Sequence, residues 1–584
     1  MEQRDKFRVR CLTNTYADVL VALGLAKTLG SLSKDEIYIQ RDRSEYILVT
    51  ESPIGDMSDT PHFPLFDTIR AKGETNEGQT RDYEDLKARR ESYFKLPKEI
   101  RKSNELPEGI SAPSSDYSLM SSLVDLLKPI AKSTYTKTAK LLKQGAFGVY
   151  LEAALKTFSE FDSDPTQTLQ WLKEQFGKQK PDLETPAVMI FNPMSGKGMN
   201  ADKPNSIDMG GQKSVVSFEM LKFIGWWVGA IAKTPTNTKD LKVLVVVPRE
   251  IPLFDLNSLM NRVRSKTLYS SGAIQIDIIT ALEMTTELLK YHEEKEVFLE
   301  SPRQVIDGFY TVYFKNLGTS KGVSNLSFIG LPEWVHVKDD NDRIVWLEVL
   351  KEHRSILSRL DESRSEQHNL LEHYRDFLSG NALEQFLEFL VNYGVFALAQ
   401  MARDKYLLIF QTKLIDRVIS GWRESMNQEK QFTEILENQG FKNLATAIRH
   451  STFGALNAQK RHGNRTFEVR FGLAQDLKRH THSAEALLQA LSDFISQYMT
   501  ENLRATYRDK HLRQFVNTDD LQQIVYLIDK FDARTVGMLL IAYGYARDEK
   551  DKSLVLPIIA PQDSTEESLD DNSGDIEENG DDDE

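Results

Sequence analysis

The hydrophobic pattern changes once along the chain, and this change limits the folds that the chain can adopt. Before about residue 346, helical repeats alternate with short β-branched runs, which are typical of strands. After Trp346 only helical repeats remain. The sequence therefore predicts an α+β N-terminal region with mixed sheets and helices, followed by an all-α C-terminal helical bundle. The strands predicted in the middle of the chain are Ala187–Phe191, Val243–Val247, Ile274–Ile279 and Tyr310–Phe314.

The predicted domain boundaries follow from the same change. Residues 1–350 are expected to form a mixed α/β body, with long loops within 51–115 and a helical insertion over about 117–177. Residues 351–560 are expected to form the helical bundle, and residues 561–584 a disordered acidic tail. The chain opens with strand, helix and hairpin over residues 7–50. Further predicted helices are 83–94, 215–232, one that starts at Thr518, and 536–545.

Cysteine usage and hydropathy indicate a cytoplasmic protein without a membrane span. Cys11 is the one cysteine, so the chain forms no internal disulfide. The charged N-terminus is not a secretory signal. The most apolar helix has an uncharged core of 10 residues, Phe223–Ala232. A spanning helix needs about 20 residues, so we expect this helix to be buried in protein.

Charge is distributed unevenly. The net charge is −14, but 12 acidic residues lie between Asp563 and Glu584, so the rest of the chain carries −2. Residues 441–480 carry eight basic side chains against Glu468 and Asp476, a local balance of +6. Because local fields attract phosphates, this segment suits a nucleic-acid backbone. The predicted strand-path contacts are Arg449, Lys460, Arg461, Arg465, Arg470, Lys478 and Arg479.

A loop dense in Asn, Gly and Lys follows a predicted strand. Its glycines allow a backbone to approach a ligand closely, and its amide, hydroxyl and ammonium groups are donors for phosphates or base edges. The two methionines suit apolar wedges between base pairs. An ordinary surface loop is the alternative. The predicted contacts to a DNA duplex in this loop are Asn192, Met194, Ser195, Lys197, Asn200 and Lys203.

No catalytic or metal motif is complete. A phosphate-binding P-loop would need glycine where Phe191 stands and Ser or Thr where Gly198 stands. No H-E-x-x-H motif occurs, and His368 and His373 are five residues apart, a poor fit to one helix face. We therefore expect no enzyme activity, no metal and no cofactor.

Short motifs at both ends and in the centre resemble one family. They are Ala17–Ala26 with the strands at Glu36–Ile39 and Tyr46–Val49, the loop Asn192–Asn200 with its following helix, and Arg470–Lys478 with Ala542–Arg547. Together they resemble the large subunit of type I CRISPR effector complexes (Cascade), in I-B-like or myxobacterial-type variants that include transposon-associated systems.

The resemblance implies a non-catalytic subunit in antiviral defence or a transposon-linked system. Such a subunit recognises the duplex that flanks the target (the PAM), promotes strand separation into an R-loop and holds the displaced strand, while guide RNA reads the sequence. Implied partners are the guide RNA with repeat-backbone and other Cascade subunits, double-stranded target DNA, and helicase-nuclease or transposition proteins. The helical bundle would correspond to the small subunit, which translation from Met401 or Met426 would also produce separately.

Two other functions stay open at this point. One is a helical protein-interaction scaffold that does not bind nucleic acid. The other is an enzyme that binds a phosphorylated substrate through the loop Ser195-Gly196-Lys197-Gly198. Negligible duplex binding at low salt would favour the first, and saturable nucleotide binding would favour the second.

Overall fold

A computed structural model describes most of residues 4–548. Within the described residues no helix is both long enough and apolar enough to cross a membrane. The chain divides into two compact units, Met1–Val297 with Pro302–Leu331, and Phe298–Ser301 with Pro332–Glu584. The predicted tail 561–584 lies outside the described residues. Also outside are 61–68, 71–80, 98–99, 102–105, 115, 128–146, 178–182, 196–212, 268–271, 296–298, 319–320, 381, 426–431, 463–466 and 510–512.

The first unit contains two four-stranded antiparallel sheets. One has the order β1-β3-β2-β10 and contains the predicted N-terminal strand and hairpin; the other has the order β12-β11-β9-β8. All eight residues of β9 are buried, which explains the continuous apolar run Val243–Val247. The strands are β1 (Arg4–Arg10), β2 (Tyr38–Asp42), β3 (Glu45–Ile54), β8 (Ala230–Lys233), β9 (Leu241–Pro248), β10 (Glu250–Pro252), β11 (Ile306–Asn316) and β12 (Lys321–Gly330).

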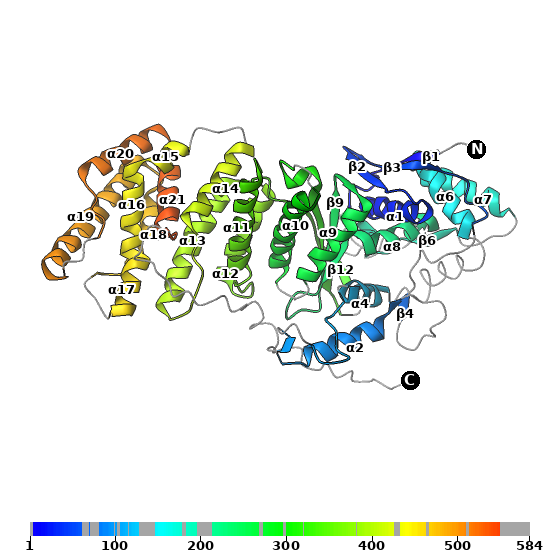
Figure 1. The fold of residues 1–584 in the computed structure, drawn as a ribbon, viewed down its shortest axis with the longest axis horizontal. Coiled ribbons are helices and arrows are strands. Elements are labelled where there is room, and N and C mark those ends of the chain that lie inside the picture. The colour runs from blue at the N-terminus through cyan, green and yellow to red at the C-terminus, as the bar shows by residue number, and fades with distance from the viewer. Residues whose placement is uncertain are drawn as a thin grey trace, which may run out of the picture. The chain divides into compact units, whose positions relative to one another are not determined.

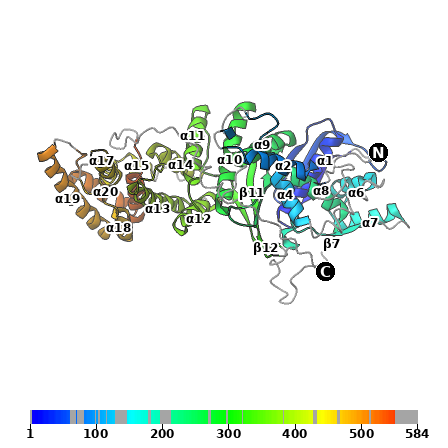
Figure 2. The same cartoon turned by 90° about the horizontal axis from the view of Figure 1, so that it is seen from below.

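Two helices pack unusually closely at the centre of this unit. They are α1 (Tyr16–Leu32) and α8 (Val216–Gly229), which lie side by side in both views (Figures 1 and 2). A methyl group added at Gly24 would overlap the carbonyl oxygen of Leu221, and one added at Gly225 would overlap that of Leu20. The two helix backbones can therefore touch only because both contact positions are glycine.

Further helices surround the sheets, and α2 has the predicted bounds. Two predicted strands are absent. Residues Ile274–Ile279 lie in the helix α10. The polar residues that alternate with the isoleucines are buried together with them. One of these, Asp277, accepts from Lys242 Nζ at 2.9 Å. The helices are α2 (Tyr83–Phe94), α4 (Asp116–Leu127), α6 (Phe147–Ser159), α7 (Pro165–Phe176), α9 (Leu253–Lys266) and α10 (Ala273–Lys295).

The other absent strand is Ala187–Phe191. The backbone N–H groups of Phe191 and Asn192 both donate to Val188 O, at 3.0 and 2.8 Å, which closes a turn. Short strands lie on either side of the segment, β6 (Glu184–Pro186) before it and β7 (Lys213–Val215) after the loop. The first unit also contains two-residue strands β4 (Ile69–Arg70) and β5 (Arg81–Asp82) and the short helix η3 (Pro302–Gln304).

The second unit is mostly helical in its described part, which confirms the predicted fold class. It begins near residue 332, and the predicted boundary at 350 falls inside α11. Its helices are α11 (Asp340–Leu357), α12 (Ser365–Gly380), α13 (Leu383–Ala402), α14 (Thr412–Ser425), α15 (Thr433–Glu437), α16 (Gln439–Arg449), η4 (His450–Gly454), α17 (Ala455–His462), α18 (Leu473–His480), α19 (Ala484–Asp509), α20 (Thr518–Lys530) and α21 (Ala533–Gly544).

The predicted start at Thr518 is confirmed to the residue. Asn517 caps α20, and its side chain and that of Asp520 each accept from the other's backbone N–H, at 2.9 Å. Aromatic side chains form the core around α11, α12 and α13, at the start of this unit. The imidazole of His353 packs among Trp334, Phe386 and Phe410, and burial lowers its pKa to about 3.

Glu352, beside that core, makes the stability of the helical unit depend on pH. Its carboxylate accepts from the backbone and side-chain nitrogens of Gln411, yet burial raises its pKa from 4.5 to about 8. Between these two values the unfolded chain loses this proton and the folded chain keeps it. The stability that Glu352 contributes is therefore fully present below pH 4.5 and is lost as the pH rises through about 8.

We predict that Glu352→Gln, which mimics the protonated side chain, removes this part of the pH dependence. Thermal unfolding at several values between pH 5 and 9 measures the effect. The variant should unfold at a higher temperature than the parent at pH 9, and the difference should shrink towards pH 5. The control is Glu348→Gln on the same helix, because that side chain is 54% exposed. Parallel pH profiles for the parent and Glu352→Gln would contradict the assignment.

Candidate nucleic-acid interface

The two ends of the predicted duplex-binding loop lie beside each other in the first unit. Strand β6 pairs antiparallel with β7, so Thr185 lies opposite Ser214 and Pro186 opposite Lys213. All residues of the loop lie between these paired strands. Its described part enters a short 3-10 helix, η2 (Pro193–Ser195). The pairing fixes both ends of the loop against the body of the unit.

A buried polar cluster holds the first residue of the loop. Asn192 is 9% exposed, and its amide nitrogen donates to the Glu219 carboxylate at 3.1 Å. The ammonium of Lys222 donates to Asn192 Oδ1 at 2.5 Å and to Glu219 Oε1 at 2.7 Å. Glu219 and Lys222 lie one turn apart on α8, so they face the same side of that helix. Asn192 is thus an anchor of the loop, and its side chain is not presented to a partner.

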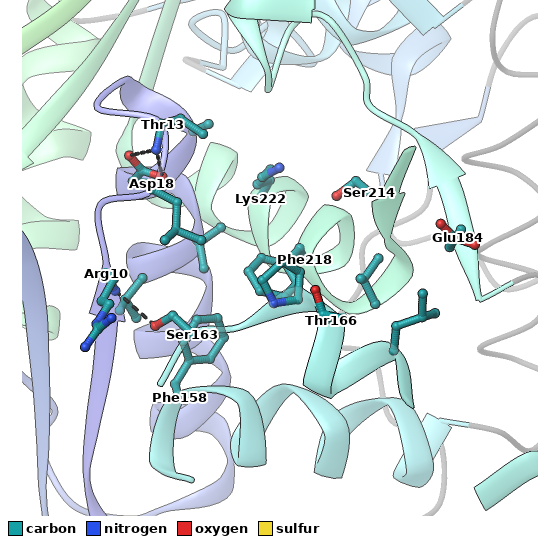
Figure 3. A pocket seen from close by; sticks show the side chains of 17 residues that line it. Arg10, Thr13, Asp18, Phe158, Ser163, Thr166, Glu184, Ser214, Phe218 and Lys222 are labelled. Atoms are coloured by element: carbon teal, nitrogen blue, oxygen red, sulfur yellow. Dashed lines mark hydrogen bonds between the residues drawn. The ribbon is translucent and has the colours of Figure 1, made fainter. Parts of the chain in front are cut away.

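A pocket of about 320 Å³ lies beside this cluster, and Lys222 lines it. Figure 3 shows Phe218 of α8 and Phe158 of α6 among the side chains around it, and their rings meet edge to face at 5.5 Å. Ser214 and Glu184 from the paired strands at the loop ends also line the pocket. The loop therefore leaves the body at the edge of a partly apolar hollow.

The opposite wall of the pocket is held by local hydrogen bonds. The Asp18 carboxylate accepts from Thr13 N at 3.0 Å, and burial raises the pKa of this carboxyl group (Figure 3). Ser163 Oγ accepts from Arg10 N at 3.0 Å and donates to Arg8 O at 2.9 Å. Ser163 has a φ of +62°, which is unfavourable for serine, so these bonds hold a strained corner in place.

The other loop residues are placed only in part. The side chain of Met194 is 43% exposed, as an apolar wedge would require. The backbone of Ser195 closes η2, and its side chain is outside the described part. Lys197, Asn200 and Lys203 also lie outside the described residues.

In the helical unit the structure corrects the prediction for Arg449. This side chain is 2% exposed, and its guanidinium donates to Ala546 O at 2.6 Å and Tyr543 O at 2.8 Å. It ties α16 to the end of α21 through one carbonyl in the last turn of that helix and one just beyond it. Arg449 therefore supports the fold and is not available to a phosphate.

Three further cations of the basic segment are engaged by acids. Lys460 Nζ lies 2.5 Å from Asp404, Arg470 pairs with Glu501 and bonds Gln497 at 2.7 Å, and Lys478 pairs with Glu388. Carboxylates from other parts of the unit thus neutralise part of the +6 balance that the sequence gives to this segment.

Arg461 at the end of α17 and Arg479 on α18 are exposed. Among the described residues, neither of these two side chains forms an ion pair. Phe471, which lies between them in the chain, is also exposed, at 46%, whereas Phe453 is fully buried. Arg465 lies outside the described residues. The described cations that remain available to a nucleic acid are therefore fewer than the sequence predicts.

The anchoring side chains Glu219 and Lys222 were missed at the level of sequence. Both lie within the most apolar helix of the chain, three residues apart and of opposite charge. That spacing in an otherwise apolar stretch is a signal for a buried ion pair, because an isolated charge could not stay there. The prediction that this helix is buried is confirmed, and Trp226 is fully covered.

Comparisons do not identify the protein. No protein-family model matches the chain, and no curated protein matches it. Among the described residues, no group of three or more His, Cys, Asp or Glu side chains is placed to hold a metal ion.

We predict that Lys222→Ala destabilises the first unit strongly. It leaves the carboxylate of Glu219, 6% exposed, without its cation, and removing one partner of a buried pair costs about 3–5 kcal/mol. Denaturant unfolding measures this loss. The double variant Glu219→Gln/Lys222→Met should recover most of it, because no charge is then left buried. Lys173→Ala, an exposed site on α7, should change stability by less than about 0.5 kcal/mol. Equal effects of Lys222→Ala and Lys173→Ala would contradict the anchor.

Proposed function

We propose that this protein is the non-catalytic large subunit of an RNA-guided DNA-targeting complex of the type I CRISPR kind. The observation that carries the proposal is the loop anchored by Asn192. Both of its ends are fixed by the β6–β7 pairing, and its root is held by Glu219 and Lys222. A loop that binds a duplex needs such a rigid support, because a loop whose ends are already fixed loses less conformational entropy on binding.

The exposed groups support contact with a nucleic acid. Met194 offers an apolar side chain beside the loop root, and Lys197 and Lys203 follow it in the sequence. In the helical unit, Arg461 and Arg479 are exposed cations, with Phe471 as an exposed ring on which a base can stack. We assign the loop to the flanking duplex and the two arginines to the strand path.

The order of the two units agrees with what the resemblance implies. A mixed α/β unit that carries the loop precedes a helical unit, as in the large subunits that the sequence motifs resemble. The proposed partners are the guide RNA with its repeat-backbone subunits and a double-stranded DNA target.

One observation favours a second candidate, a phosphate-binding enzyme. The pocket beside the loop root is lined by Lys222, Asp18 and Ser163, which are groups that could bind a small polar ligand. Calorimetric titration of the protein with ATP or GTP separates the two functions. Heat that saturates at millimolar nucleotide would support the enzyme, and no heat would remove it.

We predict that Arg461→Ala/Arg479→Ala weakens binding of single-stranded DNA and reduces its salt dependence, because the strand path holds a single strand. Each lost phosphate contact should lower the slope of log K against log salt by about 0.7. Fluorescence anisotropy with a labelled single-stranded oligonucleotide at several salt concentrations measures this slope.

A matched control carries the same change in net charge. Lys530→Ala/Arg534→Ala removes two cations that pair with Glu434 and Glu384, so it should leave the slope unchanged. If both double variants change affinity equally, then net charge and not a local contact drives binding. Absence of duplex binding by the parent protein even at low salt would favour the scaffold.

The helix boundaries bear on the proposed start of a separate small subunit. Translation from Met401 would begin inside the last turn of α13, whereas translation from Met426 would begin after α14 and include α15 to α21 entire. We predict that Met426 is the productive start. Intact-mass spectrometry of the complex should show a product of about 160 residues, near the size of one domain. It should vanish in Met426→Leu and persist in Met401→Leu. Full-length chain alone would contradict this prediction.

A further inference from the structure

The lining of the pocket beside the loop root suits an uncharged ligand (Figure 3). Nine of its 17 lining residues are apolar, four carry a hydroxyl group and four are charged. The charged residues are two cations, Arg10 and Lys222, and two acids, Asp18 and Glu184, so their charges balance. A site that attracts phosphate carries an excess of positive charge, which this lining lacks. A neutral molecule with both apolar and hydrogen-bonding surfaces therefore fits it better.

Two aromatic rings form the apolar part of the pocket. Phe158 is 3% exposed and Phe218 is 9% exposed, so packing fixes both rings before a ligand arrives. The pocket volume of about 320 Å³ is near the lower end of the range for small-molecule sites. A single flat ring system matches this size, and it contacts the two fixed rings with little loss of side-chain entropy.

Lys222 has one hydrogen-bond donor left for such a ligand. An ammonium group has three N–H donors. Two of them go to Asn192 Oδ1 and Glu219 Oε1, and the third has no acceptor among the described residues. The Lys222 side chain lines the pocket and is only 7% exposed. A buried donor without an acceptor is unfavourable, so an acceptor on a ligand would be favoured here.

Asp18 provides acceptors in the same lining. Its two carboxylate oxygens accept from one N–H group, that of Thr13, at 3.0 and 3.2 Å. A carboxylate has about four acceptor positions, so some are left for an N–H donor of a ligand. Nucleobases carry amino or ring N–H donors beside carbonyl or ring-nitrogen acceptors on one edge of a flat ring. They combine the shape and the polar groups that this pocket would recognise.

We propose that this pocket binds a nucleobase, with its ring against Phe158 and Phe218 and its polar edge towards Lys222 and Asp18. Two sources can supply such a base: a free nucleoside, or a base turned out of a DNA strand. Ser214, at the end of the loop assigned to the flanking duplex, lines the pocket. A base that leaves this duplex would therefore find the pocket beside the loop root. The second source rests on the proposed function.

Thermal unfolding with free nucleosides tests the first source. At least one of adenosine, guanosine, cytidine and thymidine, at millimolar concentration, should raise the unfolding temperature of the full chain. Thr166→Phe should abolish this shift, because Thr166 is exposed and lines the pocket, so a phenyl ring there fills its mouth. The control Gln167→Phe, at an exposed position that does not line the pocket, should keep the shift. Nucleosides carry no phosphate, so this response is separate from that of a phosphate-binding enzyme.

Fluorescence of 2-aminopurine tests the second source. This base analogue becomes brighter when it leaves the stack of a duplex. Placed in turn at successive positions of a bound duplex, it should brighten by at least about twofold at one position with the parent and with Gln167→Phe. Thr166→Phe should bind the duplex with the same affinity and leave the analogue dark.

The two measurements together decide the inference. It is overturned if no nucleoside shifts the unfolding temperature and no position brightens on a bound duplex. Responses that Thr166→Phe retains in full would overturn it as well, because they do not need the pocket. If the parent binds no duplex, the proposed function fails, and the nucleoside measurement alone decides whether the pocket binds a base.

Discussion

The close contact between α1 and α8 is the constraint on which the first unit depends. Gly24 and Gly225 let the two backbones touch, and any side chain at either position would overlap a carbonyl of the other helix. This contact fixes the rotation of α8. Glu219 and Lys222 then face Asn192, and Phe218 of the same helix faces the neighbouring pocket. The support of the loop is thus a consequence of helix packing, and the loop sequence alone does not provide it.

Several charged side chains of this protein form bonds within the fold and are therefore not available to a partner. Lys222 lies in the most apolar helix, and Arg449 and Lys478 lie in the basic segment, yet each satisfies a carboxylate or a carbonyl within its own unit. The burial of Lys222 and Arg449 makes their bonds costly to break. The groups left for a nucleic acid are those at helix ends and in the loop, such as Arg461 and Arg479.

The sequence predicts local elements well where the signal is local. The bounds of α2 and the start of α20 follow from helix propensity and capping, and the uniformly apolar β9 follows from burial on both faces. The strand predicted at Ile274–Ile279 is wrong because a distant lysine, Lys242, neutralises Asp277 and lets a polar position be buried. No local pattern contains that information.

The same distinction applies to the candidate site. The sequence identifies the loop and the basic segment, because their composition is unusual. It does not show that Asn192 is an anchor or that Arg449 is buried, since both roles depend on residues that are 27 and 97 positions away. The number of basic residues in a sequence segment therefore overestimates the positive surface that is available to a phosphate backbone.

Photo-crosslinking of the native complex tests the central claim most directly. The protein would be purified with its bound nucleic acid, irradiated, and the crosslinked peptides identified by mass spectrometry. The account predicts crosslinks in the loop that follows Asn192 and in the peptides that carry Arg461 and Arg479. Purification without any nucleic acid, or crosslinks confined to other peptides, would contradict it.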